Sequence, residues 1–204
     1  MDARQIRSRT ALAAAILELA TERPVDSLTV SEVAERAGVH RSTFYEHASS
    51  PVELLQSVLR TELDDIRLHY LAEVGEADVA AAVTAVTEAV LQHVDRYDLI
   101  YTRGLGAASG AGSLHSMLSE HFQESSRQLQ RRDAFSIPLR VDGMAPSVVR
   151  ESVAHYVAGG AVGAIEVWLT TARPRQTHPF LELFAALVPS WWPVAGNVSS
   201  LADR

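Results

Sequence analysis

Apolar residues recur every three or four positions along almost the whole chain, which is the spacing of one face of an α-helix. No segment from residue 2 to residue 188 shows the alternation of a clear strand. Proline, glycine and capping residues divide this pattern into predicted helices. We place them over about 4–22, 51–71, 78–95, 97–105, 114–132, 146–172 and 177–188, with two shorter helices between the first two. The pattern predicts an all-α fold with about nine helices.

The two short helices lie between Leu28 and His47. Thr29 can cap the first one, and Glu32 three residues later completes a capping box. Gly38 stands where a helix ends in a left-handed residue. The second short helix, Arg41–His47, has an apolar side and a side rich in hydrogen-bond donors. Two short helices joined by a tight turn are what a helix-turn-helix needs to seat its second helix in a DNA major groove.

This segment resembles the DNA-binding domain of the TetR family of bacterial transcriptional regulators. The close resemblance covers roughly residues 5–65 and rests on residues at fixed spacing. These are Leu28, Thr29, Val33, Ala34, Ala37, Gly38, Val39, Ser42, Thr43, Phe44, Tyr45, His47, Glu53, Leu54 and Leu55. The resemblance implies a helix-turn-helix DNA-binding domain over 1–50 and a ligand-binding and dimerisation domain over 51–204. The helix over about 51–71 would link the two.

The candidate DNA contacts lie on the two short helices. Arg41 is the best candidate to contact a base, because its guanidinium can bridge O6 and N7 of guanine. The resemblance implies phosphate contacts for Tyr45 and His47, and Thr29 can make another. The alternative is an ordinary solvated helix face. The full set is Thr29, Ser31, His40, Arg41, Ser42, Thr43, Tyr45 and His47.

Two residues depart from the family pattern. Ala48 stands where the family usually has an aromatic residue, and Pro51 stands where it usually has a lysine that holds a phosphate. Ser50 and Pro51 still suit the start of a helix. We therefore expect the helix to begin normally while one charged phosphate contact is lost.

The formal net charge of −7 is unusual for a DNA-binding protein. Most of the net negative charge lies after residue 50, where the chain has twelve arginines and eighteen acidic residues. Residues 1–50 have six arginines and seven acidic residues. Arg4, Arg7 and Arg9 cluster where they could reach phosphates. The chain has no cysteine, which excludes disulfides and cysteine-based metal sites or nucleophiles.

The last two predicted helices are apolar over more than one face, which favours burial against both the chain's own core and a partner subunit. Glycines in the first of them would let another helix approach closely. We expect an interface between identical subunits. Its candidate residues are Val153, Gly160, Gly163, Val167, Phe180, Phe184 and Leu187.

A ligand cavity and an ordinary core have the same composition. For one set of large side chains the sequence therefore does not decide between lining a cavity and filling the core. These are Tyr97, Tyr101, Met117, Phe122, His155 and Trp168. The glycines between 104 and 112 favour a flexible connection over a phosphate-binding loop, since no strand precedes them and no lysine follows. Trp191 and Trp192 are expected to pack over the end of the domain.

The resemblance implies a homodimeric repressor that leaves a double-stranded DNA operator when a small, largely apolar effector binds. The alternative is a helical ligand-binding protein with weak or lost DNA binding. No nucleophile–base pair or metal cluster is recognisable, so we expect neither an enzyme nor a cofactor. We expect a cytoplasmic protein without a membrane partner, because no secretory pattern or confident membrane span appears.

Overall fold

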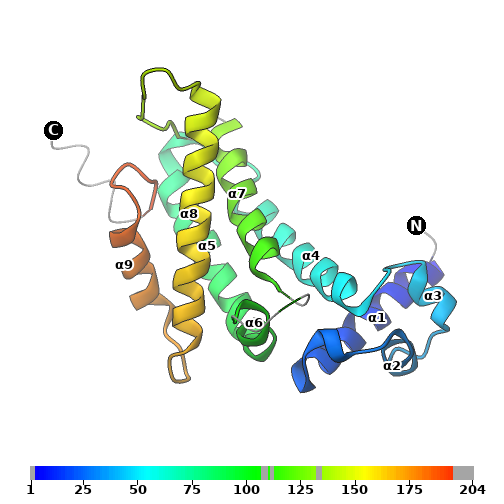
Figure 1. Cartoon of the computed structure of the whole chain (residues 1–204). Helices are drawn as coiled ribbons and strands as arrows, with labels where there is room; N and C mark the ends of the chain where they lie inside the picture. Colours follow the sequence, from blue (N-terminus) through cyan, green and yellow to red (C-terminus); the bar gives the residue numbers. More distant parts are fainter. Residues whose placement is uncertain (1–2, 107–109, 111–112, 132–134, 195–204) are drawn as a thin grey trace. The chain divides into compact units, whose positions relative to one another are not determined.

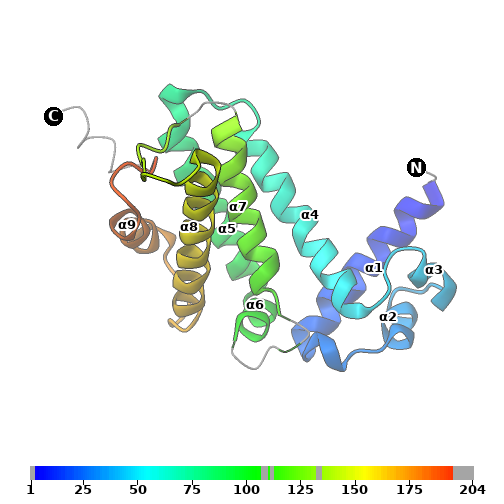
Figure 2. The same cartoon turned by 45° about the horizontal axis from the view of Figure 1, so that its top comes forward.

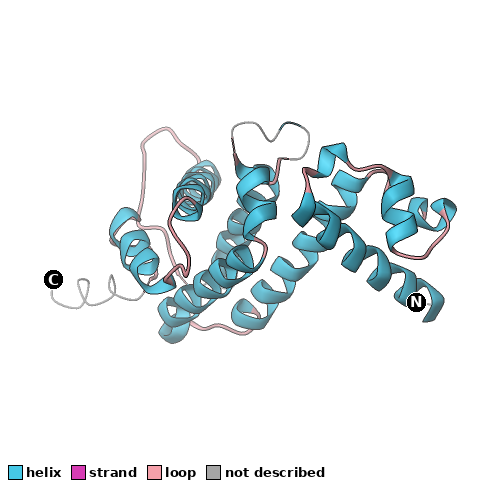
Figure 3. Ribbon diagram, turned by 90° about the horizontal axis from the view of Figure 1, so that it is seen from below, coloured by secondary structure: helices cyan, strands magenta, loops and turns pink. Residues whose placement is uncertain are grey.

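The computed structural model describes residues 3–106, 110, 113–131 and 135–194, which hold nine α-helices and no strand (Figures 1 and 3). The all-α prediction is therefore confirmed. The helices are α1 Ala3–Glu22, α2 Val30–Arg36, α3 Arg41–Tyr45, α4 Pro51–Leu71, α5 Val79–Arg96, α6 Asp98–Leu105, α7 His115–Arg131, α8 Pro146–Leu169 and α9 Thr177–Leu187. In the described part of the chain no helix is both long enough and apolar enough to cross a bilayer.

The chain forms two compact units, 1–62 with 97–115 and 63–96 with 116–204. Helix α4 begins in the first unit and ends in the second. These units differ from the predicted division at residue 50, because α6 packs with the N-terminal helices. The Arg103 guanidinium donates to the carbonyls of Ala20 and Thr21 at 2.8 and 2.9 Å, at the end of α1. A cation at these unpaired carbonyls is favourable.

Close packing, not ligand binding, accounts for one of the glycines after residue 103. A Cβ at Gly104 would lie 2.5 Å from Cγ of Leu114, so only glycine allows this contact without a shift. The Leu114 amide also donates to the Gly104 carbonyl at 2.8 Å. The centre of the predicted flexible connection, 107–109 and 111–112, lies outside the described residues.

The second unit packs α5, α7, α8 and α9 beside one another, together with the last turns of α4 (Figures 1 and 2). An aromatic contact joins α9 to α8, because the ring centroids of Phe180 and Trp168 lie 5.9 Å apart. Within α9, Phe180 also stacks on Phe184 at 6.4 Å. Trp192 is buried and contacts Phe135 at 5.3 Å, as expected for a residue that packs over the end of the domain.

Candidate functional site

The start of α2 is built by the predicted capping box. The Glu32 amide donates to the Thr29 hydroxyl at 3.3 Å, and the Thr29 amide donates to the Glu32 carboxylate at 2.8 Å. Arg23 forms an ion pair with the same carboxylate. The Arg23 hydrogen bond, followed by those from Thr29, lowers the pKa of Glu32 from 4.5 to about 2. The cap thus stays ionised at neutral pH.

The turn between α2 and α3 has the geometry of a Schellman motif. Gly38 has φ of +65°, its amide donates to the Glu35 carbonyl at 3.1 Å, and the Val39 amide donates to the Ala34 carbonyl at 3.0 Å. The left-handed conformation explains the glycine, because a side chain there would be strained. The turn sets the direction in which α3 leaves α2.

Helix α3 is anchored on one side only. Phe44 is fully buried and Ala48, just after the helix, is also buried. His47 lies close to α1, with Nε2 2.9 Å from the Ser8 hydroxyl. The sequence indicated no role for Ser8, which lies thirty-nine residues before its partner. These contacts hold α3 against the unit and leave its other side in solvent.

The solvent side of α3 carries most of the predicted DNA contacts. His40, Arg41, Ser42 and Tyr45 are exposed, and Tyr45 keeps 55% of its surface accessible. Thr43 is half-buried. Within the described part of the chain, no hydrogen bond or ion pair engages the Arg41 side chain. The helix presents a guanidinium and several hydroxyls side by side, which suits contact with base edges and phosphates.

Two other candidates belong to α2. Ser31 is exposed in its first turn. Thr29 is exposed as well, but its hydroxyl both accepts from the Glu32 amide and donates to the Glu32 carboxylate at 2.7 Å. The Thr29 hydroxyl could therefore donate to a phosphate only if its hydrogen bond to the Glu32 carboxylate were broken.

The start of α4 forms as the sequence indicates. The Ser50 hydroxyl accepts from the Glu53 amide at 3.2 Å, and the Ser49 amide donates to the Glu53 carboxylate at 2.8 Å. The hydrogen bonds from Ser49 lower the pKa of Glu53. Pro51 is the first helical residue and is buried. A complete helix N-terminus is thus present without a lysine.

The six candidate ligand residues are divided between the two units. Tyr97 and Tyr101 belong to the first, where Tyr97 donates to Glu62 at 3.1 Å and Tyr101 is fully buried. Met117 and Trp168 are buried in the second unit, His155 is exposed, and Phe122 lines a cavity. Of the six, Phe122 alone is among the described residues lining that cavity.

This cavity lies among α5, α7, α8 and α9 and has a volume of about 40 Å³. His121 lines it, is 5% exposed, and has no hydrogen-bond partner at either ring nitrogen among the described residues. Burial, with smaller contributions from Arg67 and His93, lowers the pKa of His121 to about 3, so the ring is neutral. His121 is not among the six residues that the sequence indicated for a ligand.

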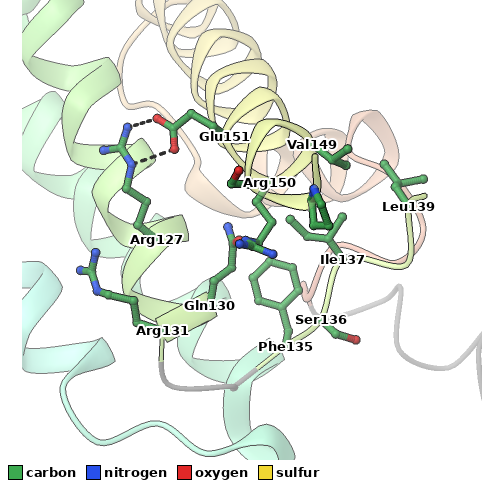
Figure 4. A pocket seen from close by; sticks show the side chains of 12 residues that line it. Arg127, Gln130, Arg131, Phe135, Ser136, Ile137, Leu139, Val149, Arg150 and Glu151 are labelled. Carbon is green, nitrogen blue, oxygen red and sulfur yellow. Dashed lines mark hydrogen bonds and ion pairs between the residues drawn. The ribbon is translucent and has the colours of Figure 1, made fainter. Parts of the chain in front are cut away.

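A larger hollow of about 620 Å³ lies where α7 ends and α8 begins (Figure 4). Arginines and apolar side chains line it. Two of the arginines are already paired, Arg127 with Glu151 and Arg131 with Glu124. The third, Arg150, is exposed to solvent. None of the described residues that line this hollow has a buried side-chain polar atom without a partner, whereas His121 has two.

Helices α8 and α9 expose large apolar side chains. Tyr156 is 71% exposed, Val167 67% and Leu187 60%, and Gly160 is exposed on the same helix as Tyr156. Of the other candidate interface residues, Val153 and Gly163 are half-buried. Phe180 and Phe184 are buried in the core of the same chain, at 4% and 6% exposure.

Residues 12–58 match the family described as bacterial regulatory proteins, tetR family. YxbF of Bacillus subtilis, an uncharacterized HTH-type transcriptional regulator, is 33% identical over 70 residues, which are 34% of this chain and 18% of YxbF. TtgW of Pseudomonas putida, also an uncharacterized HTH-type transcriptional regulator, is 32% identical over 90 residues, 44% of this chain and 66% of TtgW. This chain thus covers less than two thirds of either relative.

The fold is also similar to the crystal structure of RolR in complex with resorcinol. The TM-score is 0.58 at 17% sequence identity, over 98% of this chain and 95% of RolR. At this identity the likeness is one of fold. The helix-turn-helix, the family match across it and the two HTH-type relatives agree with one another, and residues 12–58 form a DNA-binding domain of the tetR family of bacterial regulatory proteins.

Proposed function

We propose that the protein is a DNA-binding transcriptional regulator, in which α3 enters a major groove. The observation that carries this proposal is the exposed donor face of α3 on a helix-turn-helix whose cap, turn and buried side are complete. Arg41 and Tyr45 are exposed there while Phe44 is buried. Arg4 and Arg7 on α1 are exposed as well and would add phosphate contacts.

The regulator is proposed to act as a homodimer joined through α8 and α9. The large apolar side chains exposed on these helices support this, because contact with a partner subunit would remove their surface from water. A two-fold axis would place two α3 helices in successive major grooves of a palindromic operator. The second unit would bind a small, largely apolar effector. RolR, which shares the fold, has been crystallised with the ligand resorcinol.

Effector binding would shift the population toward a state whose two α3 helices no longer match the groove spacing. We expect this to release DNA, which makes the protein a repressor. The other candidate, a helical ligand-binding protein with weak DNA affinity, is supported by Pro51 and Ala48 in place of a lysine and an aromatic residue.

Gel-shift titration against the DNA flanking the protein's own gene separates the two. We expect a discrete complex that survives excess scrambled DNA and whose affinity falls steeply with salt. A protein that binds flanking and scrambled DNA equally, or neither, would instead be the ligand-binding protein without an operator.

A further inference from the structure

The cavity around His121 contains polar groups that nothing in the described chain satisfies. Both ring nitrogens of His121 and the indole nitrogen of Trp192 lack a hydrogen-bond partner there, and both residues line the cavity. Leaving a buried donor or acceptor unpaired costs free energy. Three such atoms beside one cavity indicate that its occupant is a molecule able to form hydrogen bonds.

The remaining wall determines what the rest of that occupant must be. Aliphatic side chains and the rings of Phe122 and Phe184 make up most of it, and no charged side chain is among its described lining residues. Thr87, Ser125 and Ser126 also line it. The Thr87 and Ser125 hydroxyls donate to the carbonyls of Val83 and His121 in their own helices, and the Ser126 hydroxyl accepts from Gln130 at 3.0 Å. A charged ligand would lose its hydration without compensation, which disfavours carboxylates and amines.

We infer that this cavity is the effector site, and that His121 anchors an uncharged molecule with a hydroxyl group on a compact apolar body, such as a phenol or a cyclic alcohol. A hydroxyl can donate to the unprotonated nitrogen of a neutral imidazole and accept from an indole N–H. The assignment of the ligand as effector rests on the proposed function. The hydrogen-bonding role of His121 does not.

The size of the cavity sets a condition. A buried water needs roughly 10–15 Å³ on this measure, so 40 Å³ accommodates a few waters and a ring must displace neighbouring side chains. Phe122 is half-buried and can move more easily than the fully packed core residues. The occupied state therefore has a different packing from the empty one, as a switch between two states requires.

Calorimetry with phenol, toluene and benzoate tests the inference, since the three probes share a ring and differ in hydrogen bonding and charge. Wild-type protein should bind phenol roughly tenfold more tightly than toluene, and benzoate least. His121→Phe should weaken phenol binding to the level of toluene. His115→Phe, which alters an exposed histidine at the start of the same helix and outside the cavity, should bind all three as wild type does.

A second measurement avoids any variant: phenol should shift the ring nitrogen resonances of His121 in wild-type protein. Equal affinity for phenol and toluene, a preference for benzoate, or no binding of any probe at millimolar concentration would overturn the inference, and the last would mean that the cavity holds only water. The DNA complex is measured separately. Phenol binding that depends on His121 but leaves that complex intact would remove the effector role and keep the site.

Discussion

Substitution of Arg41 tests the contribution of one side chain to the proposed DNA interface. Arg41 is exposed in the first turn of α3, and its fork can bridge two acceptors of one guanine. Arg41→Ala should weaken binding to the operator by about 1–3 kcal/mol and relax the preference at one base pair per half-site. Binding measured against a library of single-base operator variants would show both effects.

The matched control is Arg140→Ala, which removes the same charge from an exposed position in the second unit. It should leave operator affinity almost unchanged. If Arg41→Ala weakens binding to all sequences equally, Arg41 contacts only phosphate and α3 lies differently in the groove.

Two buried histidines should make stability depend on pH. Burial lowers the pKa of His121 to about 3, and burial followed by Arg96 lowers that of His93 to about 4, from 6.5. Between the lowered pKa of each histidine and its ordinary value of 6.5, that histidine binds more protons in the unfolded chain than in the folded one. The free energy of unfolding should therefore be undiminished above pH 6.5 and fall as the pH drops, by up to about 1.4 kcal/mol per pH unit for each histidine.

Urea unfolding between pH 7.5 and 5 measures this loss. His121→Phe should reduce the pH dependence, because one of the two groups is gone, whereas His155→Phe should retain it. A wild-type unfolding free energy that does not change down to pH 5 would show that these rings are protonated in the folded protein.

Among whole helices, α2 and α3 are too short to be stable by themselves, so their ends matter most. Thr29→Ala removes the side-chain half of the capping box and should lower the free energy of unfolding by about 1 kcal/mol. Thr29→Ser keeps a capping hydroxyl and should cost much less. Urea unfolding of the three proteins at pH 7 compares them, and equal losses for Ala and Ser would mean that the hydroxyl does not stabilise α2.

The helix ends show which boundaries can be predicted from neighbouring residues alone. Helix α4 begins at Pro51 and ends at Leu71 as predicted, because a serine cap and the Gly75 break are both local. Helix α3 ends at Tyr45, two residues earlier than predicted, and His47 after it contacts Ser8 of α1. Helix α8 ends at Leu169 instead of Ala172, with Thr170 as its C-cap. These shorter ends depend on contacts or backbone geometry that periodicity does not encode.

The assembly of the whole molecule can be tested on α9. Phe184 is buried beside Phe180 in its own chain, so a charge there would disrupt the protomer itself. Leu187 is 60% exposed on the same helix and is the better site. Leu187→Glu should convert a dimer into a folded monomer that no longer binds two half-sites, as measured by analytical ultracentrifugation and gel shift.

Leu139→Glu is the control, because Leu139 is also apolar and 45% exposed but lies before α8. It should remain dimeric. A Leu187→Glu protein that sediments as a dimer, or a wild-type protein that is monomeric at micromolar concentration, would place the interface elsewhere or remove it.

The sequence alone determined the helical class, most helix boundaries, the capping box at Thr29 and the turn at Gly38. Each of these depends on residues within a few positions of one another, which is the range over which helical periodicity and capping act. The donor-rich face of α3 could also be predicted locally. In this helix of five residues only Phe44 is buried, so the polar residues around it fall on the other side.

Tertiary structure alone decided which large side chains are core and which remain exposed. Phe184 and Leu187 are both apolar and lie on one helix, yet one is buried in its own chain and the other is not. The unpartnered imidazole of His121 could not be found from the sequence either. Whether a polar group is satisfied depends on helices distant along the chain, because hydrogen bonding in a core is a property of packing and not of spacing.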